Sequence, residues 1–158
     1  MQLDSAEILA HTLTSNNLIA DVFISRGNLF YSNHLLVKAD SSYRIAREML
    51  VNRKKDNRYL LVLKKLAISN YYLGNNPEVL NFTLEGLKVA RSLDNKMFQG
   101  TFNNISGIAM DGMGNRAQAL KYYLHALEIF EALQDKEKIA SVETNIGVIY
   151  EEQKNKIK

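Results

Sequence analysis

The three histidines, His11, His34 and His125, are the residues best suited to metal binding or proton transfer, and their spacing tests that chemistry first. They are far apart, and none has the His-x3-His or His-Glu-x-x-His spacing that places two ligands on one helix face. His125 and Glu128 could share a helix face at an interval of three residues, and such a pair is typical of a solvated or groove-edge helix surface. The sequence therefore predicts no metal site.

A glycine-containing segment, Gly112-Met-Gly114-Asn-Arg-Ala117, has the spacing of a dinucleotide-binding fingerprint. That fingerprint needs a preceding strand to aim the phosphates at a helix, whereas the apolar pattern before Gly112 is helical. We interpret the segment as a turn between helices. No Gly-x-Ser-x-Gly or phosphate-loop motif occurs, the carboxylates are scattered, and zero cysteines exclude thiolate nucleophiles and disulfides. We therefore predict no catalytic residue, no cofactor and no enzyme activity in this segment.

The elements that would position any functional group are helices. Apolar residues recur at intervals of three and four along the chain, which contains one proline and no period-two alternation. With 46% apolar and 23% charged residues, the composition is that of a globular domain. Glycine at positive φ and proline at a helix start predict turns at Gly74–Pro77 and Gly114–Asn115. We predict an all-α fold, with helices over residues 3–14, 17–33, 36–53, 57–73, 77–93, 96–112, 116–133 and 136–154.

The charge balance argues against nucleic acid or membrane as a partner. The net charge is +3 and is spread along the chain, whereas nucleic-acid modules concentrate Lys and Arg on one face. The densest basic stretch, Arg53 to Arg58, falls between two helical patterns and is typical of a solvated turn. The start of the chain is acidic, and no apolar run approaches the roughly 18 residues of a spanning helix. We predict no nucleic-acid contact, no membrane insertion and, since cysteine is absent, a cytoplasmic location.

The sequence repeats itself at a step of 40 residues. Leu80, Leu84, Leu87, Val89 and Leu93 recur as Leu120, Leu124, Leu127, Ile129 and Leu133, and Gly27 recurs through Ala67 and Gly107 to Gly147. Small residues at such intervals allow two helices of a hairpin to cross closely, and stacked hairpins then bury their apolar faces. In the third repeat Asn104 matches Asn145 at a step of 41, so the register of that helix is left open by one residue.

These small and aromatic positions resemble the tetratricopeptide repeat (TPR) family, in the 40-residue long-helix variant found in bacterial signalling proteins. The segments that carry the resemblance are Gly27 with Ala39-x3-Tyr43-x2-Ala46, Gly114 with Ala119-x3-Tyr123-x2-Ala126, and Asn145-Ile-Gly147. The chain departs from the family pattern at His34, where glycine is usual, at Asn70 and Thr83, where aromatics are usual, and at Gly86, where alanine is usual. The resemblance implies an α-α superhelix of antiparallel hairpins with about seven to eight helices and a concave side.

The same alignment predicts how the chain is organised. It gives one TPR-like domain over residues 1–158, with a half repeat at 1–15, repeats at about 16–55, 56–94 and 95–134, and a half repeat at 135–158. Because the last helix lacks its partner, we expect a segment of a longer protein or a homodimer through the exposed terminal helices. Either arrangement should cover Ile146, Ile149 and Tyr150. The aromatic residues at 30, 31, 43, 71, 72, 122, 123 and 130 have helical spacing and are expected mostly to fill the core.

The resemblance also implies a peptide-binding groove, lined by the first helix of each hairpin. The groove positions fall on Ser25, Asn28, Tyr31, Lys64, Lys65, Ile68, Tyr72, Asn104, Ile108, Asp111, Asn145, Val148 and Glu152. Asn side chains can bridge a peptide backbone, and Lys64 and Lys65 can take a carboxylate. Asp111 and Glu152 argue against a dedicated clamp for a terminal carboxylate, and an empty solvated face is the other interpretation.

The function predicted from the resemblance is a non-catalytic scaffold that binds a protein or peptide. We expect it to be the sensory or regulatory region of a larger bacterial signal-transduction protein. Two alternatives stay open, which are an intracellular receptor for short signalling peptides and a structural oligomerisation module. The sequence names neither the partner nor any attached kinase, cyclase or DNA-binding domain.

Overall fold

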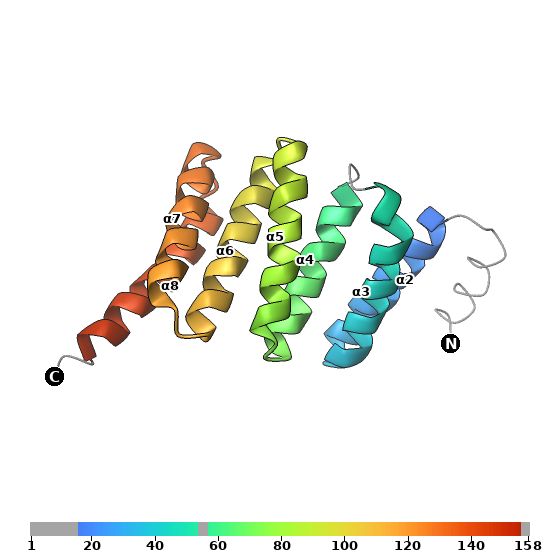
Figure 1. Ribbon diagram of the computed structural model, residues 1–158, viewed down its shortest axis with the longest axis horizontal. Helices are drawn as coiled ribbons and strands as arrows, with labels where there is room; N and C mark the ends of the chain where they lie inside the picture. The colour runs from blue at the N-terminus through green and yellow to red at the C-terminus, as the bar shows by residue number, and fades with distance from the viewer. Residues whose placement is uncertain (1–15, 54–56, 156–158) are drawn as a thin grey trace. The chain divides into compact units, whose positions relative to one another are not determined.

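The computed structural model describes residues 16–53 and 57–155, which form helices joined by short turns (Figure 1). The elements are α2 (Asn16–Ser32), α3 (Leu36–Leu50), the 3-10 helix η1 (Val51–Arg53), α4 (Asn57–Tyr72), α5 (Asn76–Ser92), α6 (Lys96–Gly112), α7 (Arg116–Ala132) and α8 (Lys136–Asn155). No strand occurs in these two ranges, so the predicted all-α fold is confirmed. The helix predicted over residues 3–14 lies outside the described residues.

The contacts between helices divide the chain into two units, Met1–Asn75 and Asn76–Lys158. In the first unit, α3 packs against both α2 and α4. In the second, α6 packs against α5 and α7, while α8 packs against α7 and more narrowly against α6. Within each unit, consecutive helices run antiparallel (Figure 1). Each unit is therefore a stack of antiparallel helices, and the division of the whole chain into 40-residue repeats stays a prediction.

The turns between helices share one backbone conformation. Gly74 and Gly114 have the predicted positive φ, at 74° and 78°. The same left-handed conformation occurs at His34, Asp94 and Gln134, whose φ values are 58°, 49° and 55°. At each of these turns the next residue donates its N–H to a carbonyl five residues earlier, as in Leu35 to Phe30, which closes the helix end. His34 therefore replaces the usual turn glycine without changing the turn.

Glycine should be the better residue at the turns where a side chain occupies the left-handed region. His34→Gly and Gln134→Gly should each raise the free energy of unfolding by about 0.5–1 kcal/mol, because a side chain in this conformation strains the backbone. Urea denaturation of each variant measures the change. Gly114→Ala is the reverse control and should lower the stability by a similar amount. Stability unchanged in all three variants would contradict the strain.

Glycines allow the helices to cross closely, as the repeat pattern predicted. A Cβ added at Gly27 would lie 2.4 Å from Cε1 of Tyr43, and one added at Gly107 would lie 2.5 Å from Cδ1 of Tyr123. The two crossings, α2 with α3 and α6 with α7, are therefore built alike. Gly107 thus makes on α6 the same kind of contact that Gly27 makes on α2.

The departures from the family pattern at Thr83 and Gly86 have a common cause at the contact of α5 with α6. A Cβ added at Gly86 would lie 2.4 Å from Cζ of Phe102, so the ring of Phe102 occupies the space of an alanine methyl. Thr83 is fully buried, and its Oγ1 accepts a hydrogen bond of 2.7 Å from Ser106 Oγ. An aromatic ring at position 83 would remove this hydroxyl pair.

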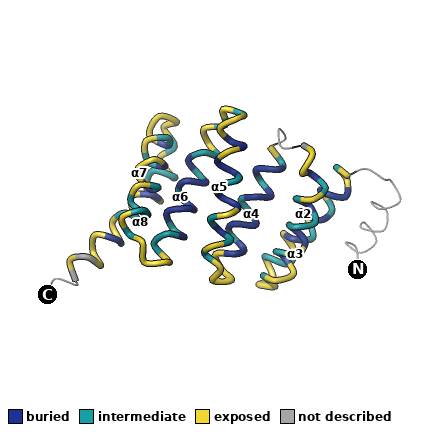
Figure 2. The backbone as a smooth tube through the Cα atoms, viewed as in Figure 1, coloured by how far each residue is buried: buried dark blue, intermediate teal, exposed yellow. Residues whose placement is uncertain are grey.

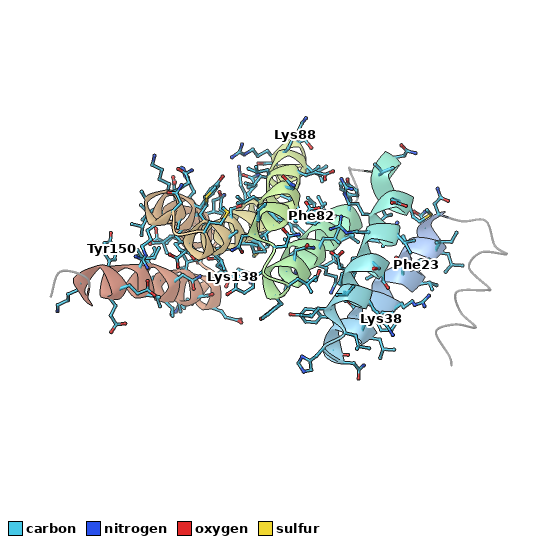
Figure 3. All side chains as sticks on the ribbon, turned by 60° about the horizontal axis from the view of Figure 1, so that its bottom comes forward. Phe23, Lys38, Phe82, Lys88, Lys138 and Tyr150 are labelled. Atoms are coloured by element: carbon cyan, nitrogen blue, oxygen red, sulfur yellow. The ribbon has the colours of Figure 1, made fainter. Side chains whose placement is uncertain are left out.

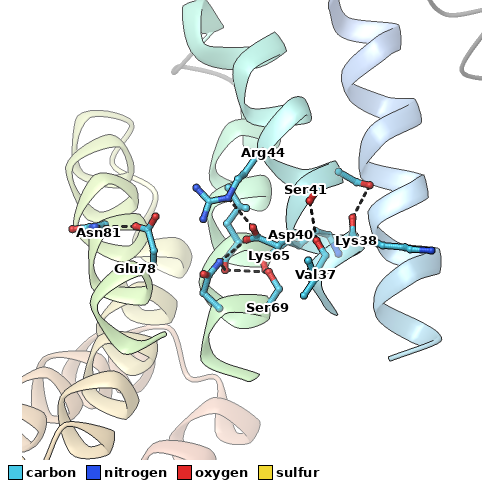
Figure 4. Close-up of polar contacts among 12 residues, drawn as sticks. Val37, Lys38, Asp40, Ser41, Arg44, Lys65, Ser69, Glu78 and Asn81 are labelled. Atoms are coloured by element: carbon cyan, nitrogen blue, oxygen red, sulfur yellow. Dashed lines mark hydrogen bonds and ion pairs between the residues drawn. The ribbon is translucent and has the colours of Figure 1, made fainter. Parts of the chain in front are cut away.

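The departure at Asn70 is explained by a polar network between α3 and α4. Asn70 is buried, and its Nδ2 donates to Asp40 Oδ1 at 2.5 Å and to the carbonyl of Leu66 at 2.9 Å. Arg44 Nε donates to the other oxygen of Asp40 at 2.7 Å, and Figure 4 shows Asp40 and Arg44 side by side on α3. The amide at position 70 thus makes two hydrogen bonds that an aromatic ring could not make.

The core runs along the facing sides of the helices (Figure 2). Tyr43, Tyr123 and Phe130 are buried, as predicted for core aromatics. The expectation was wrong for Tyr71 and Tyr72, which are 42% and 60% exposed at the end of α4.

The expectation that a further element must cover Ile149 was also wrong. Ile149 is buried in the core cluster formed with Val142, Ala126 and Phe130, because it lies on the side of α8 that faces α7. Ile146 packs partly against the same cluster, whereas Tyr150 is exposed on α8 (Figure 3). The outer face of α8 is thus less apolar than the sequence suggested.

Candidate functional site

The clearest site of the first unit is a pocket between α2, α3 and α4. It is lined by Tyr31, Tyr43, Lys64, Lys65 and Ile68, and its volume is about 150 Å³. The ammonium of Lys65 lies 5.6 Å from the centroid of the Tyr43 ring, a distance typical of a cation–π contact. Four of the five lining residues were predicted groove positions, and the structure brings them together. Tyr43, which was assigned to the core, is the fifth.

The electrostatics of this pocket favour an anion. Burial lowers the pKa of the Lys65 ammonium, and the positive charge of Lys64 lowers it further. Burial also raises the pKa of Tyr31, and the neighbouring Tyr72 raises it further. Among the described residues, no carboxylate forms an ion pair with Lys64 or Lys65. A carboxylate entering the pocket would offset the repulsion between the two ammonium groups.

Of the other predicted positions in the first unit, Asn28 and Tyr72 contact residues of this pocket and Ser25 does not. Asn28 Oδ1 accepts a hydrogen bond of 3.0 Å from the Tyr43 hydroxyl, which leaves the amide nitrogen of Asn28 as a donor. The rings of Tyr31 and Tyr72 meet edge to face with centroids 6.1 Å apart, so Tyr72 extends the aromatic wall. Ser25 is exposed, and its hydroxyl donates to the carbonyl of Asp21. Ser25 therefore gains no partner in the pocket.

Burial raises the pKa of the Tyr43 phenol to about 12, and the nearby Tyr31 contributes. Because this folded-state pKa lies above the ordinary value of about 10, the neutral phenol is favoured in the fold. The associated stability is present below about pH 10 and should be lost as the pH rises towards about 12. Ultraviolet titration of phenolate absorbance should show this late step and should lose it in Tyr43→Phe. Tyr150→Phe, which changes an exposed ring, should retain it. A Tyr43→Phe titration identical to that of wild type would contradict the assignment.

Two of the predicted groove residues of the second unit are hydrogen-bonded to each other. Asn145 Nδ2 on α8 donates to Asn104 Oδ1 on α6 at 3.1 Å. Ile108 packs partly against the core shared by α7 and α8, and Val148 is 44% exposed. The two asparagines therefore join α6 to α8 in this structure, and their role as peptide ligands stays a prediction.

Arg116, at the start of α7, was not predicted as a site residue and pairs with both acidic groove positions. Its guanidinium forms an ion pair with Asp111 at 3.7 Å from Nε, and its Nη2 contacts Glu152. Asp111 and Glu152 thus share one guanidinium within the unit, which offsets one of their two negative charges. The spacings of 5 and 36 residues follow no helical interval, so sequence periodicity gave no signal for this contact.

Two further expectations concern charge and metal chemistry. Arg58, in the densest basic stretch, is half-buried and pairs with Asp21 on α2 at 3.2 Å, so it is not simply a solvated turn residue.

Within residues 16–53 and 57–155, no three His, Cys, Asp or Glu side chains are placed to hold a metal ion. None of the described helices combines the length and the apolar character needed to cross a bilayer.

The fold defines a class, an all-α helical-repeat protein, here with a pocket between neighbouring helices. No protein-family model and no curated protein matches the sequence. The structure is similar to that of BtubC (BKLC) from P. vanneervenii, with a TM-score of 0.75 and 23% identity over 96% of this chain and 62% of that one. It is also similar to the N-terminal domain of stress-induced protein-1 (STI-1) from C. elegans, with a TM-score of 0.66 and 17% identity over 84% of this chain and 98% of that one.

At these identities the likeness shows the fold alone. The chain spans 62% of the length of the BtubC chain, which is less than two thirds. The predicted fold class, a helical-repeat stack, is confirmed by both comparisons.

Proposed function

We propose that this chain is a non-catalytic scaffold that binds an acidic segment of another polypeptide in the pocket formed by Tyr31, Tyr43, Lys64, Lys65 and Ile68. The observation that carries the proposal is the pair of half-buried lysines, which no carboxylate among the described residues neutralises. Two ammonium groups with an aromatic wall suit a carboxylate side chain attached to a peptide, because the charge is matched and the backbone can lie along the tyrosines.

The resemblance to TPR proteins supports the same proposal from another direction. In that family the first helix of each hairpin lines the binding surface, and α2 and α4 supply four of the five pocket residues. The likeness in fold to the STI-1 domain agrees with this assignment. We also propose that the chain is the sensory or regulatory region of a larger cytoplasmic signal-transduction protein. The support for this role is the resemblance to the TPR family.

Peptide selection tests this function directly. A displayed library of random heptapeptides should yield binders enriched in Asp and Glu. Lys65→Met, which removes the charge and keeps the apolar stem, should weaken the selected peptides by about tenfold, since one charge-assisted hydrogen bond stabilises a complex by about 1.5 kcal/mol. Fluorescence anisotropy measures the affinities.

The matched control is Lys88→Met, which removes an exposed lysine of α5 outside the pocket. It should leave the affinities unchanged. A library that gives no acidic enrichment, or binders that Lys65→Met does not weaken, would refute the proposal.

A second candidate is the predicted homodimer, for which the exposure of Val148 and Tyr150 on α8 is the supporting observation. Light scattering across a concentration series decides this point. A mass near 18.0 kDa at every concentration would remove it, whereas a stable dimer that Tyr150→Glu dissociates would support it.

A further inference from the structure

A cavity of the second unit lies on α6, between the C-terminal ends of α5 and α7. Its volume is about 360 Å³, within the range of small-ligand and peptide pockets. Arg91, Lys96 and His125 supply basic groups at its wall, and Ile129 and Leu133 supply apolar surface. None of these five residues is among the predicted groove positions.

Basic side chains outnumber acidic side chains in the lining of this cavity. Arg91, Lys96 and His125 face Glu128, the one carboxylate among the described lining residues. Lys96 pairs with Asp94 at 2.8 Å, but that aspartate is largely exposed, so the pair is screened by water. The first turn of α6 contains no acidic residue, so the positive end of its helix dipole adds to the same sign.

The apolar wall lies directly beside these charges. Ile129, in the last turn of α7, is half-buried, and Leu133, which caps the C-terminal end of that helix, is 40% exposed. On the floor, Asn103 Nδ2 donates to the carbonyl of Gln99 at 2.9 Å, so its amide oxygen is left to accept from a ligand. A ligand that matches all three features carries a carboxylate, an apolar group and a backbone N–H.

This cavity is separate from the predicted groove. On an α-helix each residue turns by about 100°, so Asn103 and Gln99 lie about 100–140° around α6 from Asn104. Ile108 and Asp111 share the stripe of Asn104, because they follow it at intervals of four and three. The cavity and the stripe of groove positions therefore occupy different faces of α6.

We propose that this cavity is a second peptide-binding site, which takes an acidic segment with a carboxylate next to a leucine-like side chain. Arg91 and Lys96 hold the carboxylate, Ile129 and Leu133 contact the apolar side chain, and the Asn103 amide oxygen accepts a backbone N–H. The site does not depend on the pocket at Lys65, since it belongs to the other unit and uses different residues.

The test uses three capped heptapeptides and the full chain. The probe is Gly-Glu-Leu-Glu-Glu-Leu-Gly, and the two controls replace its three glutamates by glutamine or its two leucines by alanine. NMR chemical-shift mapping locates the binding site, and each titration gives a dissociation constant. The probe should shift the signals of Gln99, Asn103 and His125 and should bind at least tenfold more tightly than either control.

The variants separate this site from the pocket at Lys65. Arg91→Gln with Lys96→Gln should weaken the probe about tenfold or more, while the paired control Lys88→Gln with Lys121→Gln, on exposed lysines outside the cavity, should have no effect. Lys65→Met should also leave the shifts at Asn103 unchanged. Circular dichroism checks that each variant is folded.

Three results would overturn the second site. They are equal affinity for the glutamate and glutamine peptides, shifts confined to residues outside the cavity, and no binding at about 1 mM probe, which corresponds to a binding free energy weaker than about −4 kcal/mol. Shifts only around Tyr31 and Lys65 would retain the proposed function and reject this inference. Shifts only around Asn103 would retain this inference and reject the proposed function.

Discussion

Gly107→Ala should lower the free energy of unfolding by about 1–3 kcal/mol, whereas Gly147→Ala should raise it by up to about 1 kcal/mol. The two glycines stand 40 residues apart, which is the step at which the sequence repeats. A Cβ at Gly107 would lie 2.5 Å from two ring atoms of Tyr123, while a Cβ at Gly147 meets nothing within 4 Å. The first substitution overpacks a helix crossing, and the second replaces a glycine within a helix by a better helix former.

Urea denaturation followed by circular dichroism measures both changes. Tyr123→Leu in the Gly107→Ala background serves as a second control, because removing the ring should remove most of the overpacking. If Gly107→Ala and Gly147→Ala shift the midpoint in the same direction, the assignment of Gly107 to the crossing is wrong.

Asp40→Ala should also lower the free energy of unfolding by about 1–3 kcal/mol, through the polar network between α3 and α4. Asp40 accepts hydrogen bonds from both Asn70 and Arg44, and the Asn70 side chain is buried. Without the carboxylate, one amide proton of the buried Asn70 loses its acceptor. A buried donor left without a partner bears its full desolvation penalty.

The comparison with Arg44→Met identifies the source of this penalty. The Arg44 side chain is 41% exposed, so the loss of its ion pair should cost about 1 kcal/mol or less. A double-mutant cycle between Asp40→Ala and Asn70→Ala should show strong coupling, since each residue is the partner of the other. Equal effects for Asp40→Ala and Arg44→Met, with additive behaviour in the cycle, would mean that a surface ion pair accounts for the whole effect.

The fold was largely predictable because its signals are local or periodic. Apolar spacing of three and four located the helices, and Gly74 and Gly114 marked two turns. The left-handed residues His34, Asp94 and Gln134 gave no such signal, because their side chains do not report the strained φ that the turn imposes. The termination of α3 at Leu50, followed by η1, was likewise not marked by a glycine or a proline.

The candidate site was predictable only where neighbouring positions on one helix define it. Lys64, Lys65 and Ile68 share a face of α4 and did converge on one pocket. Tyr43 lies on α3. Its helical spacing correctly predicted a core aromatic, but that spacing carries no information about the hydrogen bond from its hydroxyl to Asn28. The contacts of Arg116 and the cavity beside Asn103 depend on three helices each, and no single-helix pattern encodes such a meeting.

The polar network of Asp40 and Asn70 has a consequence for how such a chain can evolve. The positions 40 residues further on are Leu80 and Met110, and the hydroxyl pair of Thr83 and Ser106 likewise has no counterpart in Tyr43 and Leu66. Deleting one repeat length would set Asp40 opposite Met110, so the Asp40 carboxylate would lose the hydrogen bond that Asn70 donates. The repeats look alike in sequence but are not interchangeable modules, so loss or duplication of one repeat would need compensating substitutions at its neighbours.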